Sequence, residues 1–180
     1  YYETAAQEGA IDYDKTVQYP FGYGLSYTEF EQKMGELEEK DGQISVDVEV
    51  TNTGDVAGKD VVEVYYKPPY TNGGIEKSSA NLIEFAKTDL LQPGESQIVT
   101  TTFSIEDMAS YDENNAKAYV LEKGDYVISI NSDSHTVLDQ KTYTADADVV
   151  YEGENKRASD NTAATNVFED AKGDITYLSR

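Results

Sequence analysis

Apolar and polar residues alternate along much of this chain, which is the pattern of β-strands rather than helices. Between positions 44 and 50 every second residue is Ile or Val, and the residues between them are Ser, Asp and Glu. This two-residue period predicts a strand with one buried face and one face in water. Positions 60–67 repeat the alternation with apolar residues on both faces, so we expect a central strand there. Further strands are predicted at 28–34, 82–90, 96–103, 118–121, 124–130 and 137–144.

Turn-forming residues separate these segments and indicate the fold class. Pro68 and Pro69 end the central strand, because proline has no N–H to donate to a sheet ladder. Ser104 and Asp107 resemble the start of a helix, which must be short because a turn follows at 112–115. Seven or eight short strands with one short helix predict an all-β fold, an antiparallel β-sandwich with extended N- and C-terminal segments. Its expected core consists of Val46, Val48, Val50, Val62, Val64, Phe103, Tyr126, Ile128 and Ile130.

Composition narrows the functions open to the chain. The net charge of -21 argues against nucleic acid and anionic membranes, since phosphate binding depends on clustered Lys and Arg. There is no cysteine, which excludes disulfides and thiolate metal sites, and no apolar run approaches the roughly 20 residues that span a bilayer. The chain starts without a methionine or signal peptide, so we expect an internal segment of a larger protein. The missing cysteines and the acidic balance favour a bacterial cytoplasm over secretion, although composition alone does not determine the compartment.

The stretch 19–27 is rich in aromatic residues and glycine. Its four rings are those of Tyr19, Phe21, Tyr23 and Tyr27. The proline between the first two fixes its own φ, and two glycines permit positive φ or close backbone approach. We expect the segment to fold tightly, with its rings packed inward, and to pin the chain as it crosses between domain surfaces. A linker that makes only non-specific contacts would have the same composition.

A second candidate contact region is the long connection at 70–79, which includes Tyr70 and Ile75. Long loops at one end of a rigid pair of sheets are common sites of contact with other domains. A solvated loop without a partner would have the same sequence, and both interpretations stay open.

One family resemblance accounts for these features together. The stretch 19–30 reads YPFGYGLSYTEF and resembles the segment by which family 3 glycoside hydrolases, the β-glucosidase family, leave an α/β sandwich domain and enter a fibronectin type III-like domain. The resemblance continues in order and spacing through VEVTNTGDVAG at 48–58, LQPGES at 91–96, DMASYD at 107–112 and GDY at 124–126. It implies an immunoglobulin/fibronectin type III-like β-sandwich. Tyr126 also resembles the corner tyrosine of immunoglobulin-like sandwiches, whose hydroxyl bonds to nearby backbone.

The resemblance implies three parts and a set of neighbours. Residues 1–26 would be a linker from a preceding α/β sandwich domain, residues 27–145 the fibronectin type III-like sandwich, and residues 146–180 an extended linker. The last stretch, 166–180, resembles the lead into the (β/α)8 barrel of family members with reversed domain order. The implied partners are therefore the α/β sandwich and barrel domains of the same polypeptide, with no nucleic acid and no membrane.

No residue is assigned a catalytic role. Glycosidases use paired carboxylates, but 35 acidic residues make such pairs uninformative here. By resemblance, the nucleophilic Asp of the family lies in its barrel and the acid/base Glu in its α/β sandwich domain, and neither motif occurs in this chain. The single histidine, His135, has no second His or Cys nearby and is expected in a surface turn, so we predict no metal site and no cofactor.

Two functions remain open. The favoured one is a non-catalytic scaffold domain of a β-glucosidase-like enzyme that hydrolyses terminal non-reducing β-linked sugars. By the resemblance, the choice of sugar is decided in other domains of that enzyme. The alternative is a carbohydrate-binding module in which some of the 15 tyrosines serve as platforms for a weak oligosaccharide contact. The absence of tryptophan, the strongest platform, favours the scaffold. The residues expected at the domain contacts are Tyr19, Phe21, Tyr23, Tyr27, Tyr70 and Ile75.

Overall fold

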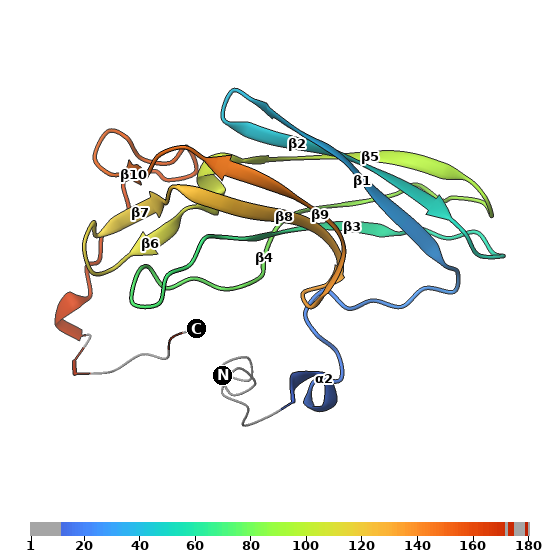
Figure 1. The fold of residues 1–180 in the computed structure, drawn as a ribbon, viewed down its shortest axis with the longest axis horizontal. Coiled ribbons are helices and arrows are strands. Elements are labelled where there is room, and N and C mark those ends of the chain that lie inside the picture. Colours follow the sequence, from blue (N-terminus) through green and yellow to red (C-terminus); the bar gives the residue numbers. More distant parts are fainter. Residues whose placement is uncertain (1–11, 172, 175–178, 180) are drawn as a thin grey trace.

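Two antiparallel β-sheets packed face to face form the body of the chain in the computed structural model (Figure 1). The structure describes residues 12–171, 173, 174 and 179. One sheet has the order β1-β2-β5, with β1 (Phe30–Lys40), β2 (Gln43–Asn52) and β5 (Ser96–Ser104). The other has the order β4-β3-β8-β9, with β3 (Val61–Lys67), β4 (Asn81–Lys87), β8 (Gly124–Asp133) and β9 (Thr136–Ala145). The predicted antiparallel all-β sandwich is confirmed, and β3 is central as expected.

A small third sheet lies at one end of the sandwich (Figure 1). Its order is β10-β7-β6, with β6 (Ser110–Asp112), β7 (Ala118–Leu121) and β10 (Val149–Tyr151). Short helical turns complete the described part, namely α2 (Tyr13–Thr16), η1 (Ile105–Met108) and η2 (Glu169–Ala171). Within the described residues, no helix is long and apolar enough to cross a membrane.

The core lies between the two large sheets and is built from alternate residues of their strands. The four apolar residues of β2 between 44 and 50 are at most 1% exposed, whereas Asp47 and Glu49 between them face solvent. Removing each such Val or Ile side chain from water stabilises the fold by about 1.5–3 kcal/mol. All predicted core residues are buried, which confirms that part of the interpretation. The Tyr126 hydroxyl donates to the backbone oxygen of Glu122 at 3.0 Å, so the corner tyrosine is confirmed as well.

The first strand is longer than predicted. The expected strand at 28–34 begins at Phe30 and continues to Lys40. A bulge between Met34 and Leu37 shifts the register, so that these two residues pair with successive inward residues of β2 although they are three positions apart. The bulge interrupts the two-residue period, which is why the pattern did not reveal the second half of the strand.

The helix predicted to start at Ser104 is only the single 3₁₀ turn η1. The Ser104 side chain makes no capping hydrogen bond, so its predicted capping role is wrong. The Ile105 N–H donates instead to the backbone oxygen of Gly42 at 2.9 Å, which ties the turn to the β1–β2 connection. The buried side chains of Ile105 and Met108 then anchor it to the core, and β6 follows at once.

The residues after Asp146, predicted as a polar extension, contain the short strand β10. Val149, Val150 and Tyr151 pair antiparallel with residues 121, 120 and 119 of β7. Three residues are too few to display a period, and this strand exists because β7 offers it a partner.

Candidate domain interface

The N-terminal stretch 12–28, here called the strap, crosses the outer side of the four-stranded sheet before it enters β1 (Figure 1). The ring of Tyr13 in α2 stacks on His135 in the β8–β9 turn, with the ring centroids 3.9 Å apart. The backbone oxygen of Phe21 accepts a hydrogen bond from the Ser134 N–H at 2.8 Å. His135 therefore lies in a surface turn as predicted, and this turn holds the strap.

A buried asparagine fixes the other end of the strap. Asn52, the last residue of β2, is fully buried and accepts a hydrogen bond from the Thr28 hydroxyl at 2.9 Å. Its amide nitrogen donates to the backbone oxygens of Val56 and Leu91 at 2.8 and 2.9 Å. Alternation alone does not predict this connecting role; its signal in the sequence is a polar residue in phase with the buried face of β2.

Gly22 allows the strap to approach β3 closely. Its φ of +85° lies in the left-handed region, and a Cβ there would overlap the Glu63 carboxylate and lie 2.7 Å from the Tyr65 hydroxyl oxygen. Only glycine suits both this conformation and this space. The buried Tyr65 donates to Glu63 Oε2 at 2.9 Å. Burial raises the pKa of Glu63, and the hydrogen bond from Tyr65 offsets this only in part.

Large side chains at every second position from 19 to 27 of the strap are exposed and form an alternating row. All five members are exposed, from 44% for Tyr23 to complete exposure for Tyr27; they are Tyr19, Phe21, Tyr23, Leu25 and Tyr27. The predicted inward packing of the four rings is therefore wrong. Because Gly22 occupies the position against β3, its neighbours on either side are directed outward. The described residues leave these five side chains uncovered.

A hollow of about 360 Å³ lies beside the strap. Leu25 of the strap and Leu138 of β9 contribute exposed apolar surface to its walls, and Glu63 and Lys59 contribute charges. Such a mixed, open hollow next to an exposed apolar row can receive a side chain of a neighbouring surface.

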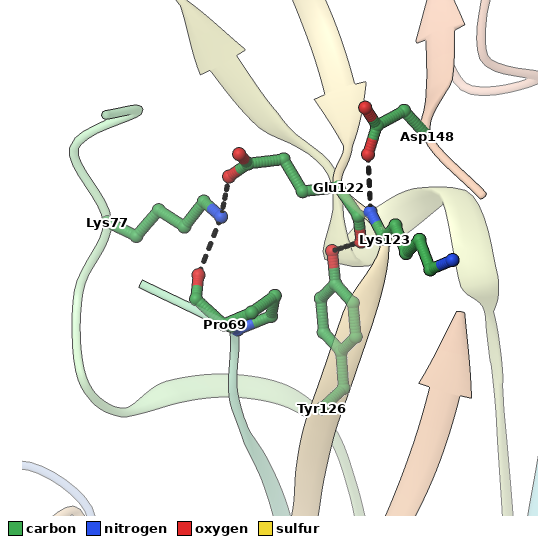
Figure 2. A network of polar contacts seen from close by, with 6 residues as sticks. All are labelled: Pro69, Lys77, Glu122, Lys123, Tyr126 and Asp148. Atoms are coloured by element: carbon green, nitrogen blue, oxygen red, sulfur yellow. Dashed lines mark hydrogen bonds and ion pairs between the residues drawn. The ribbon is translucent and has the colours of Figure 1, made fainter. Parts of the chain in front are cut away.

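The β3–β4 loop, residues 68–80, is held from within by a lysine. The Lys77 side chain is 2% exposed, and its ammonium donates to the Pro69 backbone oxygen at 2.7 Å and pairs with the Glu122 carboxylate (Figure 2). Tyr70 and Ile75, both predicted as contact residues, are half-buried in this loop.

The predicted contact residues thus form two groups rather than one site. The strap packs near the start of β3, at Glu63, whereas the loop begins directly after Lys67 at its end. The first group comprises Tyr19, Phe21, Tyr23 and Tyr27, and the second comprises Tyr70 and Ile75. In the part of the chain that the structure describes, no cluster of His, Asp or Glu is arranged to hold a metal ion.

Comparison with known proteins connects this geometry to a family. Residues 60–134 match the fibronectin type III-like domain. The chain is 36% identical to a β-glucosidase of Ruminococcus albus over 156 residues (84% of this chain, 15% of the relative) and 36% identical to β-glucosidase A of Butyrivibrio fibrisolvens over 180 residues (89% and 21%). The crystal structure of the Kluyveromyces marxianus β-glucosidase in complex with glucose is similar with a TM-score of 0.70 and 31% identity, over 77% of this chain and 16% of that one.

This chain contains a fibronectin type III-like domain of the β-glucosidase family. It corresponds to a non-catalytic portion of those enzymes, in agreement with the resemblance found in the sequence. It spans only 15% to 21% of the length of the three relatives named above. In such multidomain enzymes, other parts of the same polypeptide accompany the fibronectin type III-like domain.

Proposed function

We propose that this fibronectin type III-like domain is a scaffold within a larger β-glucosidase-like glycoside hydrolase, where it keeps the catalytic domains in their relative positions. The whole enzyme would hydrolyse terminal, non-reducing β-linked sugars. The observation that carries this proposal is the alternating row of exposed apolar side chains on an anchored strap. Large apolar side chains that are exposed together on one segment often mark an interaction site.

The two groups of contact residues would face different neighbours. The strap includes most of the expected linker, residues 1–26, which would come from an α/β sandwich domain, so its exposed row would pack on that domain. The loop carries Tyr70 and Ile75 at the opposite end of β3 and would contact a second neighbour. The sandwich would occupy residues 27–145, and residues 146–180 would lead toward a (β/α)8 barrel, with β10 as the first element of that exit.

The strap is suited to this role because it is already ordered. Burying the Phe21 side chain against another domain would contribute about 1.5–3 kcal/mol. An interface segment that is fixed beforehand does not have to lose conformational freedom on contact. The effect on catalysis would be geometric, since catalytic groups on separate domains must be placed accurately for the reaction.

The alternative of a carbohydrate-binding module is supported less well by the strap geometry. Tyr19 and Tyr23 pack against each other with their rings tilted by 41° and centroids 5.1 Å apart. They therefore do not form a flat platform for successive sugar rings. Calorimetric titration of the folded chain with cello- and xylo-oligosaccharides at millimolar concentration should show no saturable heat; saturable heat would favour the binding module.

Substitutions in the strap test the scaffold directly in the full-length enzyme. Phe21→Ser and Tyr27→Ser should lower kcat/KM and the thermal midpoint of the full-length protein. The isolated chain should keep its thermal midpoint, because both side chains are exposed in it. Ile98→Ser is the matched control, since Ile98 is 63% exposed on the other sheet. If the strap variants behave like the Ile98 control, the strap is not an interface.

A further inference from the structure

The two-residue turn between β7 and β8, formed by Glu122 and Lys123, is the contact point of two distant segments (Figure 2). The Glu122 carboxylate binds the ammonium of Lys77 in the β3–β4 loop. The Lys123 N–H donates to Asp148 Oδ1 at 2.6 Å, directly before β10. The loop and the segment by which the chain leaves the sandwich are thus attached to adjacent residues of one turn.

Packing around the turn reinforces the attachment on both sides. Gly124 has a φ of +139°, and a Cβ there would lie 3.1 Å from the ring of Pro69, the second residue of the loop. On the other side, Gly124 pairs with Ala145 at the end of β9, and Leu121 pairs with Val149 in β10. Residues 121–124 therefore lie between the β3–β4 loop on one side and the end of β9 with the start of β10 on the other.

The contact between the β3–β4 loop and the Glu122–Lys123 turn depends on Lys77. A lysine side chain with 2% exposure is unusual, because burying an ammonium is costly unless it is paired. Here the cost is met by the Glu122 carboxylate, which is 36% exposed, and by the Pro69 backbone oxygen. Without the lysine, the Pro69 oxygen would lose its donor and Glu122 would turn to solvent.

We propose that Lys77 is a positioning residue that couples the β3–β4 loop to the exit strand β10 through the Glu122–Lys123 turn. The same turn residue, Glu122, also accepts the hydroxyl of Tyr126 with its backbone oxygen, so the turn is anchored to the core strand β8. A rearrangement of the loop then changes the support for the Lys123 N–H bond to Asp148, and the reverse also holds. This coupling concerns contacts within the chain and does not rest on the proposed function.

Amide hydrogen exchange of the whole 180-residue chain, followed by NMR, tests the coupling from both ends. Lys77→Met should speed exchange about fivefold or more at Gly74 in the loop, at Lys123 and across β10. Asp148→Ala, a change at an exposed residue that leaves the core intact, should speed exchange at Gly74 by a similar factor, because coupling between two sites is reciprocal. The Gly74 N–H is a suitable reporter, since it donates to the Thr71 oxygen within the loop at 2.9 Å.

A double-mutant cycle separates coupling from simple loss of structure. The exchange effects of Lys77→Met and Asp148→Ala combined should be smaller than the product of the two single effects, because each change already releases the shared turn. Lys141→Met is the matched control, because it breaks the 2.8 Å ion pair with Glu36. The exchange rates of the Lys77→Met, Lys141→Met double variant should rise by the product of the two single effects. The proposal is overturned if Lys77→Met changes only the loop, if Asp148→Ala leaves Gly74 unchanged, or if the two effects multiply independently.

Discussion

Adding one methyl group at Gly22 should detach the strap without unfolding the sandwich. In Gly22→Ala, the new Cβ would meet the Glu63 carboxylate and the Tyr65 hydroxyl, and the backbone would have to keep a φ of +85°. The Glu63 carboxylate can move, since it ends a flexible side chain. The Tyr65 hydroxyl ends a rigid and buried ring, so the strap itself must shift.

The size of the effect follows from the backbone first. A left-handed conformation costs a residue with a Cβ about 1–2 kcal/mol. Displacement of the Tyr65 contact adds to this, so 1–2 kcal/mol is a lower bound for the weakened attachment of the strap. A change of this size corresponds to a factor of about 5–30 in the population of the detached state.

The Ser134 N–H reports this detachment, because it donates to the Phe21 oxygen of the strap at 2.8 Å. In Gly22→Ala its exchange should accelerate by at least about fivefold. The thermal midpoint of the chain should change little, since no strap residue belongs to the buried core. Gly24→Ala is the control: a Cβ at Gly24 meets nothing within 4 Å, and no effect on Ser134 is expected. Equal exchange at Ser134 in the two variants would refute this account of the strap.

Three further predictions concern the sandwich itself. Ile128→Ala should lower the free energy of unfolding by about 2–5 kcal/mol in a urea titration, because Ile128 is fully buried. Ile98→Ala on the surface should change it by less than about 0.5 kcal/mol. Similar losses in the two variants would contradict the assigned core. Tyr126→Phe should lower the free energy of unfolding by about 1 kcal/mol in the same assay, because the hydrogen bond to the Glu122 oxygen is lost. An unchanged free energy of unfolding would contradict a stabilising role of this hydroxyl. Burial alone would raise the pKa of Asp112, but hydrogen bonds from three following backbone N–H groups hold it below its usual value of 3.8. Because the pKa of Asp112 is lower in the folded state than in the unfolded state, Asp112 stabilises the fold above about pH 4, and this contribution is lost as the pH falls through the folded-state pKa. Asp112→Asn should therefore flatten the decline of the thermal midpoint at acidic pH. Parallel curves of thermal midpoint against pH for the two proteins would contradict this role.

The sequence predicted those features that alternation alone determines. Strands such as β2 repeat the two-residue period over their whole length, so both their position and their buried face could be read. It did not predict the second half of β1, where a bulge interrupts the period, nor β10, which has three residues and depends on β7 for its existence. The spacing of Ser104 and Asp107 predicts a capped helix, but the hydrogen bond from the Ile105 N–H to the Gly42 oxygen, distant in the sequence, determines the shape of η1.

The residues of the candidate interface stay a prediction, and their geometry could not be predicted from the sequence. The aromatic and glycine content of 19–27 identified a special segment, yet it did not tell which side of the segment carries the rings. That is decided by Gly22, whose close approach to Tyr65 is a contact between residues more than forty positions apart. The roles of Asn52 and Lys77 were missed for the same reason, because their partners lie far away in the sequence.

The most direct test of the scaffold is a comparison of amide hydrogen exchange in this chain alone and in the full-length protein. Amides in the strap should become more protected in the full-length protein; one of them is the Tyr23 N–H, which donates to the Pro20 oxygen at 3.1 Å. Amides of the β3–β4 loop should also gain protection, whereas those of β5, which lies in the other sheet, should not. Unchanged exchange in the strap would contradict the claim that its exposed row is a domain interface.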